Sequence, residues 1–525
     1  MRMPIRSLIL ALTLVLAALA TPVLAQQSGG KLVVGRPSDA ISLDPHRATT
    51  APEVWVYNNI FETLVAVDEN MEVVPVLATS WERVDETTMR FFLKEGVTFH
   101  DGTPFNAEAV RFTIERAIDP EAPARGRPWI GPVTGATVVD DLTVDIHTAT
   151  PFGPLLNHMS LVFVIGIVSP TAVEQHGDAF GRQPVGTGPF MFENWVSNQS
   201  ITLVRNPNYH GDPAYLDEVE FRVIPEEGAR QIAFMRGDLD VLLRAAPAEL
   251  DLMRADPNVQ VLDADGLRVV YIGFNHRTAP TDDVRVRQAL VHAIDVESIN
   301  AFVVEDAMVP ASSVIAESVF GYTDTNLPER YAYDPELALE LLAEAGYERG
   351  SDGRLRDASG DPLTLVFWAS QGRDLKDREI SEAALAQLSE IGVTVEYIQR
   401  EWGAFLSALA TDDKSYNIFT LGWVTMTGDG DFGLHSTFHS TVASSNYALY
   451  DNPEVDRLLD LARQSLDQDE REAAYAEVLE HITSDVVWLP IYQTRETVVA
   501  QPHVQGYEPH PAEYYLRLAS VWMDR

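Results

Sequence analysis

The stretch LTLVFWASQGRDLKDREISEAALAQLSEIGVTVEYIQREWGAFLSALATDDKSYNIFTLGW, residues 363–423, decides the fold class of this chain. In it, apolar runs of strand length alternate with longer segments whose apolar residues recur at helical spacing. The expected strands and helices span, in chain order, residues 363–368, 376–391, 393–398, 403–410 and 416–422. This β-α-β-α-β order with short links is typical of a parallel sheet covered by helices. We therefore expect an α/β fold whose ligand lies at the carboxyl ends of these strands, after Trp368, Ile398 and Trp423.

Strand and helix signals are mixed in the same way on both sides of this stretch. Asp282 and Asp283 are expected to cap one helix, and Asp334 with Pro335 is expected to start another. Further helices are expected at 105–118, 453 onward and 470–482, and further strands at 31–35 and 488–492. Residues 89–99 are expected to form a hairpin that turns at Glu95 and Gly96.

The N-terminus is typical of a secretory signal peptide covering residues 1–25. Arg2 and Arg6 supply positive charge, residues 8–19 form an uncharged apolar run, and the tripeptide at 23–25 suits a signal peptidase. The run is too short for a membrane span, and no later stretch is long and apolar enough for one. Because no cysteine follows the cleavage site, we expect a mature protein that is free in the periplasm, without a lipid anchor.

The composition restricts the class of function. With 525 residues, of which 46% are hydrophobic, the chain has enough apolar material for two or three domains. The absence of cysteine excludes disulfides, thiol catalysis and cysteine-based metal sites. The formal net charge of −40 argues against nucleic acid as a partner, because phosphate binding needs positive charge. The acidic residues are spread along the chain, which predicts a solvated surface.

Short motifs follow one another along nearly the whole mature chain. The early ones are LATSW at 77–81, FFLKEGVTFHDG at 91–102, GTGPF at 186–190 and RNPNY at 205–209. The later ones are FN at 274–275, DVRVRQAL at 283–290, AID at 293–295, YDP at 333–335, EAGY at 344–347, EW at 401–402, GW at 422–423 and YDNPEVD at 450–456. In this order they resemble the landmarks of the dipeptide- and oligopeptide-binding family of importer receptors.

The resemblance implies a two-lobed periplasmic-binding-protein fold of type II, with an additional small domain on the first lobe. Residues 30–72, 187–276 and 490–525 are then the first lobe, 73–186 the small domain and 277–489 the second lobe. The implied function is that of an extracytoplasmic solute-binding protein of an ABC importer. It captures an oligopeptide, dipeptide or glutathione-like ligand between the lobes and docks on permease subunits. We expect a monomer that needs no cofactor and has no enzymatic activity.

The resemblance also indicates ligand-contacting positions, which are Thr49, Thr50, Glu53, Arg373, Trp402 and Trp423. Both tryptophans match aromatic positions that line the family's cleft, with core packing as the alternative. The residues at 49–53 resemble a ligand-contacting loop, and local capping of the backbone is their alternative. Arg373 lies where some dipeptide-binding relatives hold a ligand carboxylate, although an exposed surface arginine is equally compatible.

One position departs from the family pattern. Peptide-binding relatives place an aspartate three residues after the tryptophan that matches Trp423, where it pairs with the peptide ammonium, but this chain has Met426. A methionine cannot neutralise a buried ammonium. Either Asp429 or Asp431 takes over, or the ligand has no free α-amino group there. The surrounding residues 422–429 resemble glutathione-binding members more closely.

Other constellations leave alternatives open. His435 and His439, four residues apart, have a spacing that suits a metal site, but the sequence specifies no third ligand. Asp429 and Asp431 can also be read as the acid/base pair of a periplasmic hydrolase. A receptor of the same family for an opine, an oligosaccharide or a nickel chelate stays open, as does a chaperone-like role.

Overall fold

The computed structural model describes residues 28–122, 124–245, 247–305, 308–371, 373–374, 376–411 and 414–524. The predicted signal peptide, residues 1–25, lies outside these ranges. Within them, no helix combines the length and the apolar character needed to cross a bilayer.

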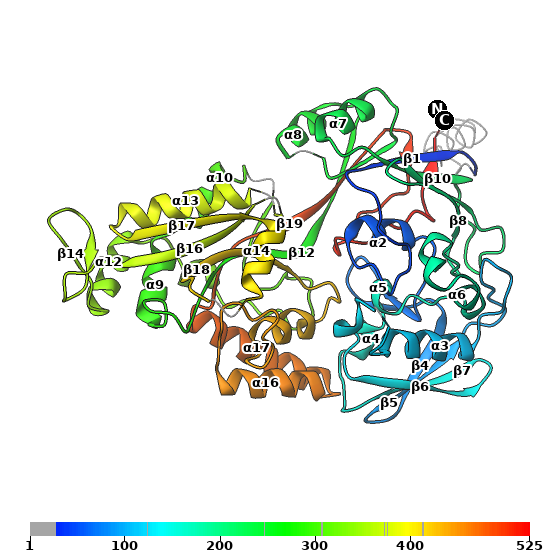
Figure 1. The fold of residues 1–525 in the computed structure, drawn as a ribbon, viewed down its shortest axis with the longest axis horizontal. Helices are drawn as coiled ribbons and strands as arrows, with labels where there is room; N and C mark the ends of the chain where they lie inside the picture. Colours follow the sequence, from blue (N-terminus) through cyan, green and yellow to red (C-terminus); the bar gives the residue numbers. More distant parts are fainter. Residues whose placement is uncertain are drawn as a thin grey trace, which may run out of the picture.

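Two long strands, β12 (Gln260–Phe274) and β19 (Trp488–Ala500), run antiparallel through the molecule and connect its two lobes (Figure 1). Their register shifts between Asp265 and Val269. On one side of this break β19 pairs with β11 (Val241–Leu243), and on the other side β12 pairs with β18 (Ile418–Val424). The two crossing strands therefore change their pairing partners at this break.

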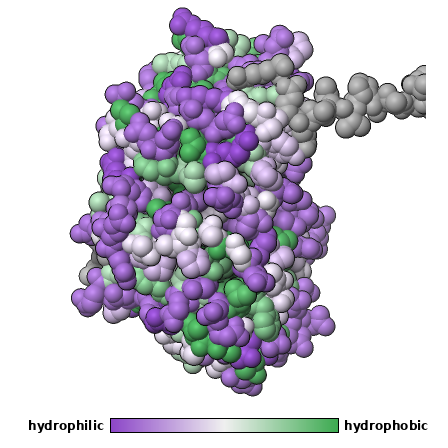
Figure 2. Space-filling model, turned by 90° about the vertical axis from the view of Figure 1, so that its right-hand side faces the viewer, coloured by the Kyte–Doolittle hydropathy of each residue, from purple (hydrophilic) through white to green (hydrophobic). Residues whose placement is uncertain are grey.

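The first lobe extends the sheet from β11. The next strands in order are β1 (Lys31–Arg36), β10 (Glu218–Val223), β9 (Ser200–Arg205) and β8 (Phe190–Val196). Strand β1 pairs in parallel with both of its neighbours, β10 and β11. Parallel pairing is possible because long stretches of sequence separate β1 from each of these strands. Helices α7 (Glu227–Met235) and α8 (Pro247–Ala255) lie above these strands in Figure 1, and an apolar cluster that includes Phe234, Met253 and Val499 joins them to the sheet. The face of this lobe in Figure 2 is mostly hydrophilic, as expected from acidic residues spread along the chain.

The residues expected to form the small domain contain a four-stranded antiparallel sheet. Its order is β4 (Ala78–Asp85), β5 (Thr88–Leu93), β7 (Thr143–Thr148) and β6 (Val133–Asp140), and α3 (Ala107–Ile118) packs on it. The expected helix is confirmed, with Asn106 accepting a capping hydrogen bond from Ala109. The expected hairpin at 89–99 is wrong, because β5 pairs with β4 and β7 and not with the residues that follow Gly96.

The second lobe confirms the β-α-β-α-β run. Strand β16 (Thr364–Gln371) pairs in parallel with both β17 (Thr394–Glu401) and β18, and the connecting helices are α13 (Asp377–Glu390) and α14 (Trp402–Leu409). The same lobe holds α9 (Val284–His292), α12 (Pro335–Glu344), α16 (Pro453–Gln464) and α17 (Gln468–Ser484). Asp283 and Asp334 cap α9 and α12 as expected, and Asn452 caps α16. The α/β class and the two lobes are thus confirmed.

Candidate ligand-binding site

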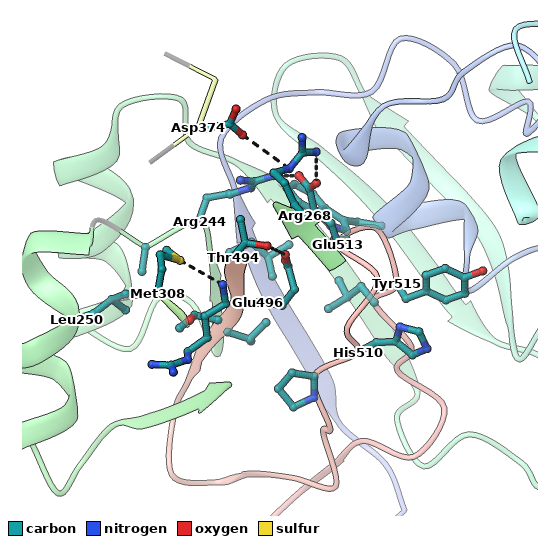
Figure 3. Close-up of a pocket in the computed structure, with 18 of the residues that line it drawn as sticks. Arg244, Leu250, Arg268, Met308, Asp374, Thr494, Glu496, His510, Glu513 and Tyr515 are labelled. Carbon is teal, nitrogen blue, oxygen red and sulfur yellow. Dashed lines mark hydrogen bonds and ion pairs between the residues drawn. The ribbon is translucent and has the colours of Figure 1, made fainter. Parts of the chain in front are cut away.

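A cavity of about 420 Å³ lies where the crossing strands meet the two lobes (Figure 3). Its size falls in the range of pockets that bind small ligands. The lining side chains come from segments far apart in sequence and include Trp55, Arg244, Arg268, Met308, Arg373, Asp374, Glu496, His510, Glu513 and Tyr515. Both lobes, both crossing strands and the C-terminal segment therefore contribute to a single cavity.

An ion cluster around the buried side chains of Arg268 and Glu513 forms one wall of the cavity. Arg268, on β12, donates from Nη2 to Oε2 of Glu513 at 2.6 Å, and Arg244 pairs with the other oxygen of the same carboxylate. Burial opposes ionisation of Glu513, but the two arginines outweigh it and lower the pKa of this carboxyl group. Because Glu513 already has two arginine partners, this wall is a fixed feature of the site.

Arg373 is held much more loosely than the other two arginines. Its Nη1 lies 3.9 Å from Oε1 of Glu513 and 4.0 Å from Oδ1 of Asp374, both longer than a hydrogen bond. Its guanidinium lies 5.6 Å from the ring centre of Trp402. Arg373 thus presents a cation to the cavity with two carboxylates near it but neither within hydrogen-bond distance, so its guanidinium can still donate to an incoming anionic group.

Glu496, on β19, faces the same cavity (Figure 3). Burial, and then the negative charge of Glu513, raise its pKa to about 7, against the opposing effect of Arg244 and Arg268. Thr494 donates to its Oε1 at 3.3 Å. A proton is therefore shared between Glu496 and solvent near neutral pH, and a ligand cation would shift that balance toward the ionised form.

We expect the raised pKa of Glu496 to make the fold less stable at high pH. Because the pKa of Glu496 is higher in the folded protein than in the unfolded chain, its protonated form stabilises the fold. This stabilisation is complete below the pKa of the unfolded chain, near 4.5, and is lost as the pH rises through about 7. Between pH 5 and pH 8, the free energy of unfolding of Glu496→Gln should therefore rise by about 2 kcal/mol relative to that of the wild type. Urea unfolding of both proteins at the two pH values measures this. Identical pH dependence in the two proteins would contradict the assignment.

Of the residues expected to contact ligand, the structure brings only Arg373 to this cavity, with Trp402 directly behind it. Trp423 lies on β18 with its ring 6.5 Å from that of Phe432, and Met426 is buried. Thr50 donates its hydroxyl to Glu53, whose carboxylate also accepts from the backbone of Ile41. Thr50 is the N-cap residue of α2 (Ala51–Tyr57), but its side chain makes no capping hydrogen bond to the backbone of that helix. Thr49 is half-buried in the same segment.

Asp429 and Asp431 each have partners within the protein. Asp429 accepts from Nη2 of Arg471 at 2.7 Å and 2.8 Å, and from the hydroxyl of Tyr475 at 3.2 Å. Asp431 pairs with Nε of Arg463 at 2.9 Å. Both carboxylates are about 1% exposed, so neither is brought to the cavity that holds Arg373.

The sequence reasoning did not single out Arg244, Arg268, Glu496 or Glu513. Arg268 and Glu496 carried a usable signal, since each is a charged residue within a long strand that crosses the molecule. Buried charges in such strands need partners, which makes them candidates for a site. Glu513 lies in an irregular segment 245 residues from Arg268, and its sequence context carries no comparable signal.

The lobes also touch away from this cavity, where the small domain meets the second lobe. The backbone N–H of Gly153 donates to the carbonyl of Arg463 at 2.9 Å, and the side chain of Asn157 donates to the carbonyl of Thr427 at 3.0 Å. Nε2 of His158, on α4 (Leu155–His158), lies 3.3 Å from Oδ2 of Asp431. With contacts between the lobes both here and at the cavity, the structure is a closed arrangement.

Gly153→Ala is expected to hinder this closure. A Cβ at this position would lie 2.3 Å from the backbone oxygen of Ser465, on the opposite lobe. Ligand affinity should fall by at least about tenfold, because apparent affinity scales with the fraction of closed molecules. Calorimetric titration and small-angle scattering measure the two effects. Gly403→Ala is the control, since its Cβ meets only Glu401 of the same lobe. Unchanged affinity and shape in Gly153→Ala would contradict the expectation.

The family model of bacterial extracellular solute-binding proteins, family 5, matches residues 72–445. The chain belongs to this family. It is 30% identical to heme-binding protein A of Haemophilus influenzae over 486 residues, which are 87% of this chain and 85% of that protein. It is 27% identical to the glutathione-binding protein GsiB of Pectobacterium atrosepticum, with 94% of each chain covered.

Solved structures agree with the two-lobed fold. The periplasmic binding protein DppA of Helicobacter pylori, associated with an ABC transporter and determined with the peptide STSA, superposes with a TM-score of 0.78 at 27% identity. The match covers 95% of this chain and 99% of that one. The chain is thus an extracytoplasmic solute-binding protein of family 5 with the type II fold of periplasmic binding proteins.

Proposed function

We propose that this receptor captures a short peptide or a glutathione-like peptide in the cavity between its lobes and delivers it to an ABC importer. The observation that carries the proposal is that the lining of one cavity includes both a cation and a carboxylate that can bind a ligand. Arg373 lies 3.9–4.0 Å from two carboxylates without a hydrogen bond to either. Glu496 accepts no hydrogen bond from an arginine of the described residues, and its pKa is raised to about 7. A zwitterionic ligand supplies a carboxylate for the first and an ammonium for the second.

Glu496 is the proposed replacement for the aspartate that Met426 has displaced. Asp429 and Asp431 are committed to Arg471 and Arg463, so a ligand ammonium at either would have to break a buried ion pair. Glu496 would release its proton when an ammonium binds, because a neighbouring cation favours the ionised carboxylate. The names of relatives that bind glutathione or peptides support the same ligand class.

The proposed route of the protein follows from its N-terminus. Residues 1–25 act as a cleaved signal, and the mature chain is a monomer that moves freely in the periplasm without a lipid anchor. In the closed form, both lobes present a joint surface to permease subunits. Binding occurs without turnover, since Asp429 and Asp431, the pair considered for hydrolysis, already bind basic side chains.

Thermal unfolding of the mature protein with a ligand panel tests the proposal. The panel holds reduced glutathione, di- to pentapeptides, N-acetylated peptides, an opine, oligosaccharides, haem and nickel chelates. A ligand that binds only the folded state raises the unfolding midpoint in a concentration-dependent manner. We expect shifts with glutathione or free short peptides, without cleavage products in chromatography. Shifts confined to non-peptide ligands would overturn the ligand class, and product accumulation would overturn binding without turnover.

A further inference from the structure

A cluster of two histidines and one aspartate lies in the second lobe, outside the ligand cavity. His435 ends η3 (Asp431–His435), His439 follows α15 (Ser436–Phe438), and Asp460 lies on α16. The two imidazole rings stack with centroids 4.5 Å apart. Nε2 of His435 and Nε2 of His439 lie 3.7 Å and 3.5 Å from the same oxygen of Asp460. The folded chain therefore supplies the third group that the sequence did not specify.

His439 is the member of this cluster whose side chain has an unsatisfied hydrogen-bonding atom among the described residues. The residue is 6% exposed, and its Nε2 is buried without a hydrogen-bond partner among the described residues. Its Nδ1 lies 2.9 Å from the hydroxyl of Thr441, which can orient the ring with Nε2 directed at Asp460. A buried nitrogen without a partner is costly, and such an atom in a native protein calls for an explanation.

A single metal ion would account for these distances. Zinc binds imidazole nitrogen and carboxylate oxygen at about 2.0–2.2 Å, so ligand atoms around one ion are about 3–3.5 Å apart. The cluster needs only a small contraction to reach this spacing, since its ligand atoms all lie within 4.8 Å of one another. Asp460 is half-exposed, which leaves a path for the ion and room for water ligands.

Arg463 places a positive charge next to the cluster, which would repel a metal ion. Its Nη1 lies 3.0 Å from Nε2 and 3.2 Å from Nδ1 of His435. The same guanidinium is already paired through Nε with Asp431 at 2.9 Å. Arg463 can give up the contact with His435 and remain neutralised by Asp431, while the carboxylate of Asp460 offsets part of the charge of the ion.

We propose that His435, His439 and Asp460 form a binding site for a divalent transition-metal ion such as Zn²⁺ or Ni²⁺. Two imidazoles and one carboxylate suit these ions better than Ca²⁺ or Mg²⁺, which prefer oxygen ligands. The ion joins the segment after β18 to α16, next to the contact between the lobes. This site is separate from the peptide ligand and does not depend on its identity.

Calorimetric titration of untagged, chelator-treated protein with ZnCl2, and separately with NiCl2, tests the proposal. We expect one ion per chain and no uptake of Ca²⁺ or Mg²⁺. His439→Ala and Asp460→Asn should each weaken the affinity by at least about tenfold, the loss typical even of outer-sphere changes at metal sites. The control is His503→Ala, which removes a histidine that lies 2.8 Å from Asp240 in a simple pair and should leave zinc binding unchanged.

Asp460→Asn separates a loss of metal binding from a loss of folding. It alters a half-exposed side chain, so the unfolding midpoint of the ion-free protein should stay unchanged. Zinc binding of wild-type strength in Asp460→Asn and His439→Ala would overturn the proposal. An equal loss of binding in His503→Ala, or no uptake of either ion by the wild type, would overturn it as well.

Discussion

Asp429→Ala is expected to lower the free energy of unfolding by about 3–5 kcal/mol, the cost of leaving one member of a buried ion pair without its partner. Arg471 and Asp429 are both almost fully buried, and Arg471 donates to both oxygens of Asp429. Removing the carboxylate leaves a buried guanidinium without its counter-charge; among the described residues, the hydroxyl of Tyr475 and the carbonyl of Ala462 still accept hydrogen bonds from it. Urea unfolding of the ligand-free protein measures the loss.

Two variants separate this effect from the general loss of an aspartate. Asp451→Ala removes an exposed partner of Arg277 and should cost at most about 1 kcal/mol. The double variant Asp429→Ala with Arg471→Met removes both charges and should recover a large part of the stability. A loss in Asp429→Ala no larger than in Asp451→Ala would contradict a structural role for Asp429 and would favour a role in ligand binding.

Arg373→Ala is expected to weaken the binding of a peptide-type ligand by about 10- to 100-fold. Charge-assisted hydrogen bonds contribute about 1.5–3 kcal/mol each to binding, and tenfold corresponds to about 1.4 kcal/mol. The loss should fall on affinity alone, because the contacts of the Arg373 guanidinium with Glu513 and Asp374 are longer than hydrogen bonds. Calorimetric titration gives the affinity, and thermal unfolding without ligand gives the stability.

Arg378→Ala is the matched control for this prediction. Arg378 lies on α13 near Arg373 in sequence, but it is exposed, pairs with Glu379 and is absent from the cavity lining. Its removal should leave affinity unchanged. A peptide with an amidated C-terminus should bind Arg373→Ala and the wild type with the same affinity. For the free peptide, equal affinities of these two proteins would contradict the assignment of Arg373.

The sequence predicts the second lobe well because its signals are local. The strands and helices of 363–423 alternate with short links, and each element has its apolar residues at one regular spacing. The capping residues Asp283, Asp334 and Asn452 act on the residues directly after them, so their role follows from a few neighbouring positions. The expected hairpin at 89–99 failed because the partners of β5 are set by the whole four-stranded sheet.

The binding site was harder to predict because its contacts are not local. Arg268 meets Glu513 across 245 residues, and Asp429 meets Arg471 on a helix 42 residues later. Spacing within a motif cannot tell a carboxylate that faces a ligand from one that has a buried arginine partner. The same limit applied to His435 and His439, whose third partner, Asp460, comes from a separate helix.

Calorimetric titration of the mature protein with one short peptide in four forms tests the central claim most directly. The forms are the free peptide, its N-acetyl derivative, its C-terminal amide and the doubly blocked peptide, with reduced glutathione measured beside them. We predict saturable binding of one free peptide or glutathione per chain, with proton release near pH 7 and a large loss of affinity for each blocked form. Equal binding of free and doubly blocked peptides, or no binding of any peptide or of glutathione, would contradict a receptor that pairs a zwitterionic ligand with Arg373 and Glu496.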